Sequence, residues 1–575
     1  MRWELASAVS MLIVLGICSP ELGAQTTKAD APGRPWYQRA VFYEIYPRSF
    51  MDSNGDGIGD LNGIASKLGY LKALGVDAIW IAPCFPSPQV DFGYDVTDYE
   101  NIDKMYGTLA DFDRLQKVSK EHGIKIILDF VVNHTSDQHP WFVDSRSSRN
   151  SEKRDWYIWR EGEGKNPPNN WIALFGGSAW QWDGKTNEYF YHYFYPQQPD
   201  LNWRNPAVAS AMYATEEWWY KRGVAGFRLD AVDSLFEDPN LTNDPVLGGV
   251  SAYGNPNVEH KYTQNLPEVH TVLKGLRAVA NPYNAVLIGE VRDDDVSHLS
   301  AYYGSGHDEL QMPMDRMLIK IKFSAAAFRA HIAAVEASGE WPVYVTGNHD
   351  SARAWNRYGD GTHNDEIAKD IAAMFLTLRG TPILYYGEEI GMQNNDPKRR
   401  EDVKDPIGKL GWPMEKGRDG ERTPMQWDDS PNAGFSTGIP WNVIPETYKT
   451  DNVADEVKEP NSILNWYKAL LSLRHSEPAL LDGGYVPLNE NDSNVLSYLR
   501  KSDNDAVIVA INMSAEPRTV NFDLAKQGVA ADSAKTLLTT QASLKDNTSA
   551  KQLLLEPFTV YIGTVTARSV GTQDK

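Results

Sequence analysis

Four apolar stretches of the sequence each run into an acidic side chain, and carboxylates in such settings can serve as nucleophile, acid or base. The stretches carry Asp129 (KIILDFVVNH), Asp230 (GFRLDAVD), Glu290 (AVLIGEV) and Asp350 (PVYVTGNHD). Burying an unpaired charge is costly, so a carboxylate persists there only when it is paired or takes part in chemistry. Two carboxylates whose pKa values are pushed apart are what combined nucleophilic and general acid catalysis requires.

The segment around Asp230 indicates how such a side chain is placed. Residues 224–231 are predicted to form a β-strand, in which side chains alternate between two faces. Phe227 and Leu229 then share one face. Arg228 and Asp230 share the other, where the arginine would keep the carboxylate ionised. The same octapeptide is also compatible with a purely structural Arg–Asp ion pair.

Parallel strands are the elements that would bring these acidic residues together. In a (β/α)8 barrel the polar side chains at the carboxyl ends of the strands meet on one face. Further strands are predicted over residues 40–46 and 77–83, and residues 371–389 predict a helix followed by another strand. The predicted fold class is therefore α/β, a (β/α)8 TIM barrel.

Two regions of the chain do not follow the barrel pattern. Residues 134–203, rich in Trp, Tyr, Asn and Pro, are too long for an ordinary strand-to-helix connection and predict an inserted subdomain after strand 3. From residue 481 the stretches NVLSYLRK, DAVIVAINM and FTVYIGTV alternate with a period of two. They predict a C-terminal antiparallel β-domain over residues 481–570. The barrel then comprises residues 34–133 and 204–480.

In order and mutual spacing, the four acidic motifs resemble the conserved regions of the α-amylase clan, glycoside hydrolase family 13. QPDLNW and RDGERTPMQW resemble signatures of its α-glucosidase and oligo-1,6-glucosidase branch. The resemblance implies an exo-acting, retaining α-glucosidase acting on maltose and short malto- or isomalto-oligosaccharides, with transglucosylation possible. It implies that Asp230 is the nucleophile, that Glu290 is the acid and base, and that Asp350 binds and strains the sugar.

The resemblance also implies a set of substrate-binding residues. Tyr94 would stack under the terminal glucose, and Asp91 would accept hydrogen bonds from its hydroxyls. Arg422 would pair with Asp91 and close the pocket at that end, which makes an enzyme exo-acting. The complete set is Asp91, Tyr94, His134, Phe175, Phe194, Gln198, Arg228, Ala231, His349 and Arg422.

Some of these residues have a structural alternative. His134 and His349 are expected to donate to sugar hydroxyls, yet either is compatible with a capped core histidine. Phe175 and Phe194 are expected at the entrance, yet core packing suits both. In this branch Val at the position of Ala231 accompanies α-1,6 preference, because its stiff side chain narrows the leaving-group site. Ala231 therefore predicts that maltose is cleaved at least as well as isomaltose.

The sequence DSNGDGIGD predicts a calcium loop. Asp52, Asn54, Asp56 and Asp60 occupy positions 1, 3, 5 and 9 of such a loop, and Ile58 offers its carbonyl at position 7. Position 12 is a glycine and not the bidentate glutamate of an EF-hand, so other ligands would be needed. A solvated Gly/Asp turn is the alternative. The related enzymes carry such a loop, which favours structural Ca²⁺ or Mg²⁺.

Composition restricts the partners and the destination of the protein. A formal net charge of −21 argues against nucleic acid and anionic membranes as partners. A small neutral oligosaccharide is the expected partner, with a monomer favoured. Residues 1–24 resemble a secretory signal peptide, which predicts a periplasmic or secreted protein. After its removal Cys84 alone remains, so no internal disulfide can form.

Two alternative functions are left open by the sequence. Sucrose isomerases, trehalose synthases and glucosyltransferases of the same fold use the same catalytic residues, and they differ in whether water or a sugar hydroxyl takes the glucosyl group. A non-catalytic sugar-binding or transporter-associated relative is the second alternative. Such relatives lack the nucleophile or the acid, whereas Asp230 and Glu290 are both present here.

Overall fold

The computed structural model describes residues 34–566 except 503–504, 530–531 and 545. The predicted signal peptide, residues 1–24, lies outside the described residues. Among the described helices, none has both the length and the apolar character that crossing a membrane requires.

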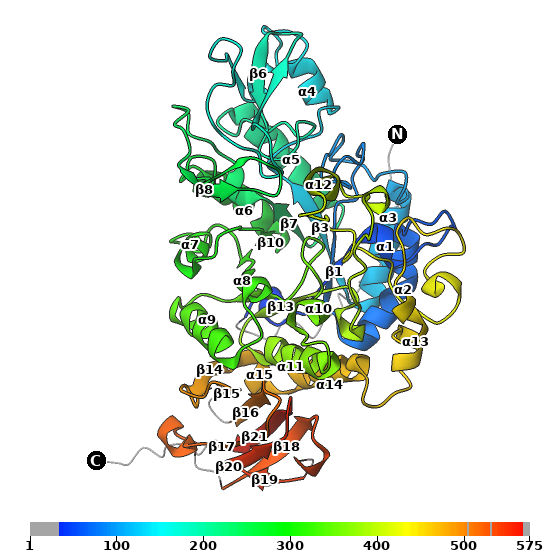
Figure 1. The fold of residues 1–575 in the computed structure, drawn as a ribbon, viewed down its shortest axis with the longest axis vertical. Helices are drawn as coiled ribbons and strands as arrows, with labels where there is room; N and C mark the ends of the chain where they lie inside the picture. The colour runs from blue at the N-terminus through cyan, green and yellow to red at the C-terminus, as the bar shows by residue number, and fades with distance from the viewer. Residues whose placement is uncertain (1–33, 503–504, 530–531, 545, 567–575) are drawn as a thin grey trace, which may run out of the picture.

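The centre of the molecule is an eight-stranded parallel barrel (Figure 1). The strands pair in the order β11-β10-β7-β3-β2-β1-β13-β12, and every pairing between them is parallel. A single bridge between Asp315 and Tyr344 joins the two outer strands and closes the barrel. The strands are β1 Phe42–Ile45, β2 Ala78–Ile81, β3 Lys125–Val131, β7 Gly226–Asp230, β10 Val286–Gly289, β11 Met312–Pro313, β12 Val343–Val345 and β13 Thr381–Tyr385.

Alternating side chains build the two sides of the barrel wall. Ile127 packs inside with Trp80 and Ile288, whereas its neighbours Ile126 and Leu128 pack outward. The outward face is covered by helices α2 Leu61–Leu74, α3 Leu109–His122, α5 Pro206–Lys221, α6 Val269–Ala280, α9 Ala325–Ala337, α11 Asn364–Thr377 and α14 Ile463–Ser476. The period of two that predicts the strands therefore also predicts which residues reach the barrel interior.

The insertion after β3 forms the predicted subdomain. It contains helix α4 Pro140–Ser145 and a three-stranded antiparallel sheet made of β4 Trp159–Arg160, β6 Glu188–Tyr191 and β5 Trp180–Asp183. Figure 1 places this subdomain at the end of the molecule opposite the C-terminal domain. A hairpin of β8 Val246–Val250 and β9 Pro256–Val258 lies beyond β7 in the chain.

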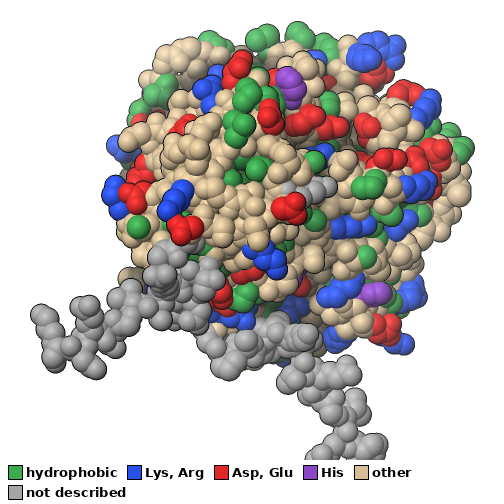
Figure 2. Space-filling view, turned by 90° about the horizontal axis from the view of Figure 1, so that it is seen from below, with side chains coloured by type: hydrophobic (Ala, Val, Ile, Leu, Met, Phe, Trp, Pro, Cys, Tyr) green, Lys and Arg blue, Asp and Glu red, His purple; other side chains and the backbone are tan. Residues whose placement is uncertain are grey.

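The C-terminal domain is antiparallel, as predicted. Its main sheet pairs in the order β14-β15-β16-β21-β18-β19, and β17 pairs with β20. The strands are β14 Gly484–Leu488, β15 Val495–Lys501, β16 Asp505–Asn512, β17 Arg518–Asn521, β18 Ser533–Thr539, β19 Thr548–Ser549, β20 Gln552–Leu555 and β21 Val560–Thr566. Arg500 donates to the carbonyl of Thr377 at 2.6 Å, which ties the domain to the barrel. On the face seen from below, Figure 2 shows acidic and basic side chains interspersed.

Candidate active site

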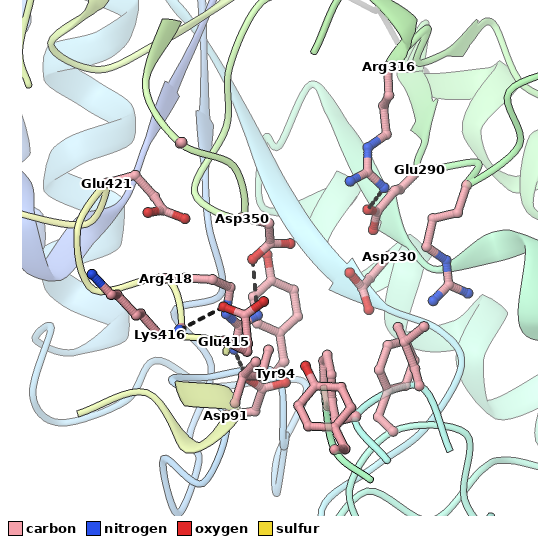
Figure 3. A pocket seen from close by; sticks show the side chains of 18 of the residues that line it. Asp91, Tyr94, Asp230, Glu290, Arg316, Asp350, Glu415, Lys416, Arg418 and Glu421 are labelled. Atoms are coloured by element: carbon pink, nitrogen blue, oxygen red, sulfur yellow. Dashed lines mark hydrogen bonds and ion pairs between the residues drawn. The ribbon is translucent and has the colours of Figure 1, made fainter. Parts of the chain in front are cut away.

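The carboxyl ends of the barrel strands surround a cavity of about 450 Å³. Asp230 is the last residue of β7, Glu290 directly follows β10, and Asp350 lies in the loop after β12. Figure 3 shows the three carboxylates facing the same space. The structure thus brings the three predicted catalytic residues together, and Asp91, Tyr94, His134, Phe175 and Phe194 also line the cavity.

Arg228 links the acidic residues beneath the cavity. It has no exposed surface, and it donates to Asp230 at 2.6 Å, to Glu290 at 2.5 Å and to Asp129 at 3.0 Å. One guanidinium therefore orients both members of the predicted catalytic pair. It also pairs with Asp129, the acid of the first motif, whose pKa is raised by burial to about 6.

The closed end of the cavity differs from the prediction. Arg422 was expected to pair with Asp91, but Arg418 does so at 2.8 Å. Arg418 also donates to Asp350 at 3.0 Å and to Asp405 at 2.7 Å. Arg422 donates to Asp350 at 2.7 Å and to the carbonyl of His349 at 2.6 Å. Both arginines belong to RDGERTPMQW, and the prediction chose the wrong one because their order in the motif does not show which reaches Asp91.

Gln198 supports Asp91 from the subdomain. Its amide nitrogen lies 3.2 Å from Asp91 and 3.0 Å from the ring of His134. Gln198 itself is fully buried. Burial lowers the pKa of His134 to about 3, so this ring is neutral at physiological pH. The terminal-glucose end of the cavity is therefore assembled from the barrel, the insertion and the Arg418 loop.

His349 lies behind the cavity wall. One ring nitrogen lies 2.5 Å from Glu44 and the other lies 2.6 Å from the hydroxyl of Tyr94, against whose ring it stacks. Both nitrogens of this fully buried ring already have protein partners, so His349 orients Tyr94 in this state. A direct contact between His349 and a sugar hydroxyl stays a prediction.

Ala231 occupies an unusual position beside the nucleophile. Its φ of 49° is left-handed, a conformation in which a β-branched residue is strained. Ala231 packs in a cluster with Phe194 and Phe175 and is not among the described residues that line the cavity. Any effect of this position on the leaving-group site would therefore be indirect, through the cluster that also contains the cavity-lining Phe175 and Phe194.

Several lining residues lie outside the predicted set. Arg316 donates to Glu290 at 2.6 Å, and Arg292 is held by Asp233 at 2.7 Å. Arg316 follows β11, which has only two residues, and so short a strand leaves no periodic signal in the sequence. Four further lining residues come from connecting segments whose positions depend on the folded barrel, namely Tyr253, Asn394, Glu415 and Arg418.

The charges around the catalytic pair favour an unexpected distribution of the proton. Burial raises the pKa of Asp230 well above its usual range, and the neighbouring Glu290 and Asp129 add to this while Arg228 opposes it. Burial also favours the neutral form of Glu290, but Arg228, Arg316 and Arg292 outweigh this effect and hold the pKa of Glu290 below its usual range. The carboxylate form of Glu290 therefore predominates, and the protonated form that an acid catalyst requires is the minor one.

The predicted calcium loop is organised by its own backbone. Asp52 accepts from the amides of Asn54 at 2.9 Å and Gly57 at 2.8 Å, and Asp60 accepts from Gly63 at 2.8 Å and so caps α2. Gly57 has a left-handed φ of 89°, and a Cβ there would meet the carbonyl of Ile439, which explains the glycine. Within the described residues no group of three His, Cys, Asp or Glu side chains is placed to hold a metal.

Comparison with known proteins identifies relatives over most of the chain. The model of the family described as "Alpha amylase, catalytic domain" matches residues 44–483. The chain is 42% identical to a probable alpha-glucosidase of Rhizobium meliloti (strain 1021) over 86% of this chain and 92% of that protein. It is 40% identical to an oligo-1,6-glucosidase of Heyndrickxia coagulans, over 85% and 93% of the two chains.

A solved structure shares the whole architecture. The trehalulose synthase of Pseudomonas mesoacidophila MX-45 superposes with a TM-score of 0.85 at 36% identity, covering 93% of this chain and all of the other. A mutant of the same synthase has been solved in complex with its substrate sucrose.

Proposed function

The chain belongs to the α-amylase family of glycoside hydrolases, and from this premise we propose that it removes terminal α-linked glucose from short oligosaccharides. It is a retaining α-glucosidase whose substrates are maltose and short malto- and isomalto-oligosaccharides. The observation that carries the proposal is the closed cavity: Arg418 joins Asp91 and Asp350 across the end beyond the catalytic pair. Only a chain end fits a cavity closed in this way, so the enzyme is exo-acting.

The reaction takes two steps. A carboxylate oxygen of Asp230 attacks the anomeric carbon while Glu290 gives its proton to the glycosidic oxygen, and the bond to the leaving sugar breaks. Glu290, now a carboxylate, takes a proton from water, whose oxygen displaces Asp230 and releases glucose. Two inversions give net retention. Asp350, whose pKa His349, Arg418 and Arg422 hold well below its usual range against the effect of burial, stays ionised to accept from sugar hydroxyls.

Stereochemistry and product analysis test this function together. We expect rapid release of p-nitrophenol from p-nitrophenyl α-glucoside, and glucose that first appears as the α-anomer in an NMR time course on maltose. Initial β-glucose would contradict the two-step mechanism. The same analysis on isomaltose tests the proposal from Ala231 that maltose is cleaved at least as well. A strong preference for isomaltose would contradict that proposal.

Transfer to a sugar hydroxyl is the second candidate function. It is supported by the close structural similarity to a trehalulose synthase, which shares 36% of its sequence with this chain. Water and a sugar hydroxyl compete for the same glucosyl ester. Incubation with sucrose or trehalose separates the two functions, because a hydrolase yields free glucose while an isomerase or transferase yields a new disaccharide.

We also propose that the loop of Asp52, Asn54, Asp56, Ile58 and Asp60 binds Ca²⁺ as a structural ion. The proposal is supported by its oxygen-only donor set, which suits a hard cation. A ligand bound by the native state alone raises stability by mass action. We expect a chelator to lower the melting temperature of the wild type, and Asp56→Ala to abolish that effect. Identical melting of metal-free and calcium-loaded wild type would exclude the site.

We also propose that the protein is exported and that it is a monomer. The N-terminal sequence and the composition support these proposals. Removal of residues 1–24 would leave a mature chain that starts at Gln25. Mass spectrometry of the mature protein and size-exclusion chromatography test both parts of this proposal.

A further inference from the structure

Glu44 is a buried acidic side chain inside the barrel. On β1 it shares a face with Phe42, which packs in the barrel interior with Trp80, because side chains two positions apart on a strand point the same way. Its exposed fraction is 1%, and it is not among the described residues that line the cavity. A carboxylate buried to this degree is retained only when it is paired or takes part in chemistry.

His349 is the partner of this carboxylate. Oε1 of Glu44 lies 2.5 Å from Nδ1 of the ring and accepts from the backbone amide of His349 at 3.3 Å. Among the residues that the structure describes, no other basic side chain forms an ion pair with Glu44. Oε2 of Glu44 is buried and has no hydrogen-bond partner within the same residues. The ring of His349 is therefore the group in contact with Glu44 that can balance its charge.

The other surroundings of the His349 ring are also rich in electrons. Nε2 lies 2.6 Å from the hydroxyl of Tyr94 and 3.5 Å from Oδ1 of Asp350. The ring is stacked between Tyr46 and Tyr94, at centroid distances of 5.9 and 5.5 Å, and aromatic faces attract a cation. Arg422 is a cation close by, because it donates to the backbone carbonyl of His349 at 2.6 Å, but its charge is paired with Asp350 at 2.7 Å.

We propose that Glu44 is a positioning residue that holds His349 as an imidazolium, with a hydrogen on both ring nitrogens, beside the terminal-glucose end of the cavity. Nδ1–H then donates to Glu44, and Nε2–H donates to the oxygen of Tyr94. The hydroxyl of Tyr94 is thereby free to donate to Asp129, whose Oδ2 lies 3.2 Å away. Each hydrogen in this chain has one donor and one acceptor.

The charge on His349 acts on two residues that the proposed function places against the terminal glucose. Burial raises the pKa of Asp350, and the positive ring of His349 acts against this effect together with two arginines. A neutral ring would remove a positive charge 3.5 Å from that carboxylate. A ring with a hydrogen on Nδ1 alone would also leave the oxygen of Tyr94 without its donor. The effect of Glu44 on activity therefore rests on the proposed function, whereas the charge of the ring does not.

The protonation of His349 is measured by NMR on protein labelled with 13C and 15N in histidine only. The signals of His349 are assigned by their absence from a His349→Asn variant. In the wild type we expect the chemical shifts of an imidazolium across roughly pH 5–8, the range in which histidine ordinarily loses its charge. Glu44→Gln keeps an acceptor for Nδ1–H and removes the negative charge. In this variant the ring should become neutral within the same range, because a nearby opposite charge favours the charged form.

Kinetics measure what the charge contributes to the reaction. The ratio of kcat/KM on maltose between Glu44→Gln and the wild type should fall by about tenfold as the pH rises across this range. The variant alone then loses the imidazolium, and a hydrogen bond from a charged group contributes about this factor. Titrations that the two proteins share cancel in the ratio.

Glu309→Gln is the matched control. Glu309 is buried and contacts Nδ1 of His270 at 2.6 Å, and neither residue is among the described residues that line the cavity. The same substitution therefore removes a carboxylate from a second histidine pair outside the site. The ratio of kcat/KM between this variant and the wild type should stay constant across the same pH range.

Two results would overturn the proposal. One is a wild-type His349 that carries a single ring hydrogen at pH 7, because Glu44 and His349 would then share one hydrogen as neutral groups. The other is a constant ratio of kcat/KM for a folded Glu44→Gln variant. If that variant fails to fold, as judged by circular dichroism, the NMR measurement on the wild type decides. Absence of wild-type activity on all α-glucosides would overturn the proposed function, and the NMR measurement would still test the ion pair.

Discussion

Asp230→Asn is expected to abolish turnover while leaving the fold intact. The amide oxygen is not a competent nucleophile, so the glucosyl ester cannot form. Removal of such a group costs about 10⁴-fold or more in kcat. Arg228 keeps its bonds to Asp129 and Glu290, so the surrounding network is retained. The decisive measurement is kcat on p-nitrophenyl α-glucoside, and a variant that kept a tenth of the wild-type rate would refute the assignment.

The stability of this variant provides an independent check. Burial raises the pKa of Asp230 well above its usual range. The folded state therefore favours the protonated form of Asp230. Keeping Asp230 ionised lowers the free energy of unfolding, and this cost grows as the pH rises above the pKa of the group in the unfolded chain. Asn carries no charge and avoids this cost, so the melting temperature of the Asp230→Asn variant at pH 7 should equal or exceed that of the wild type. Asp113→Asn, at an exposed pair with Arg222, serves as the control and should keep full activity.

Arg418→Met is expected to produce the second largest loss. Arg418 pairs with Asp91, Asp350 and Asp405 at the closed end of the cavity. Its removal leaves these three acidic residues without their common cation. Removing one partner of a buried ion pair costs about 3–5 kcal/mol, and a loss of this size in transition-state binding lowers kcat/KM by roughly 10²–10⁴-fold.

A double-mutant cycle decides which arginine acts on Asp91. Because Arg418 contacts Asp91 at 2.8 Å, Arg418→Met and Asp91→Asn should be coupled in kcat/KM by at least about 1 kcal/mol. Arg422 contacts Asp350 and the His349 carbonyl instead. Arg422→Met should lower activity but show a smaller coupling with Asp91→Asn. Equal coupling for the two arginines would contradict the pairing described here.

The sequence determines the strands that carry the catalytic carboxylates. Each is a short apolar run that leads to an acidic side chain, and the runs at residues 224–231 and 285–291 match β7 Gly226–Asp230 and β10 Val286–Gly289 to within two residues. The C-terminal strands are predictable from stretches such as NVLSYLRK and FTVYIGTV, which are rich in β-branched, aromatic and other apolar residues. Strand formation and side-chain alternation are local properties, so local pattern is sufficient to predict them.

The partners of the charged residues are decided by the tertiary structure. Arg418 and Asp91 are 327 positions apart in the sequence. The path of a long connecting segment decides that Arg418, and not the other arginine of RDGERTPMQW, reaches Asp91. Arg316 follows a strand of two residues that owes its place to its neighbours in the barrel. His349 turns toward Glu44 and Tyr94 because β1 and β12 both flank β13. Side-chain pairing depends on where separate segments meet in space, and a local sequence pattern carries no information on that.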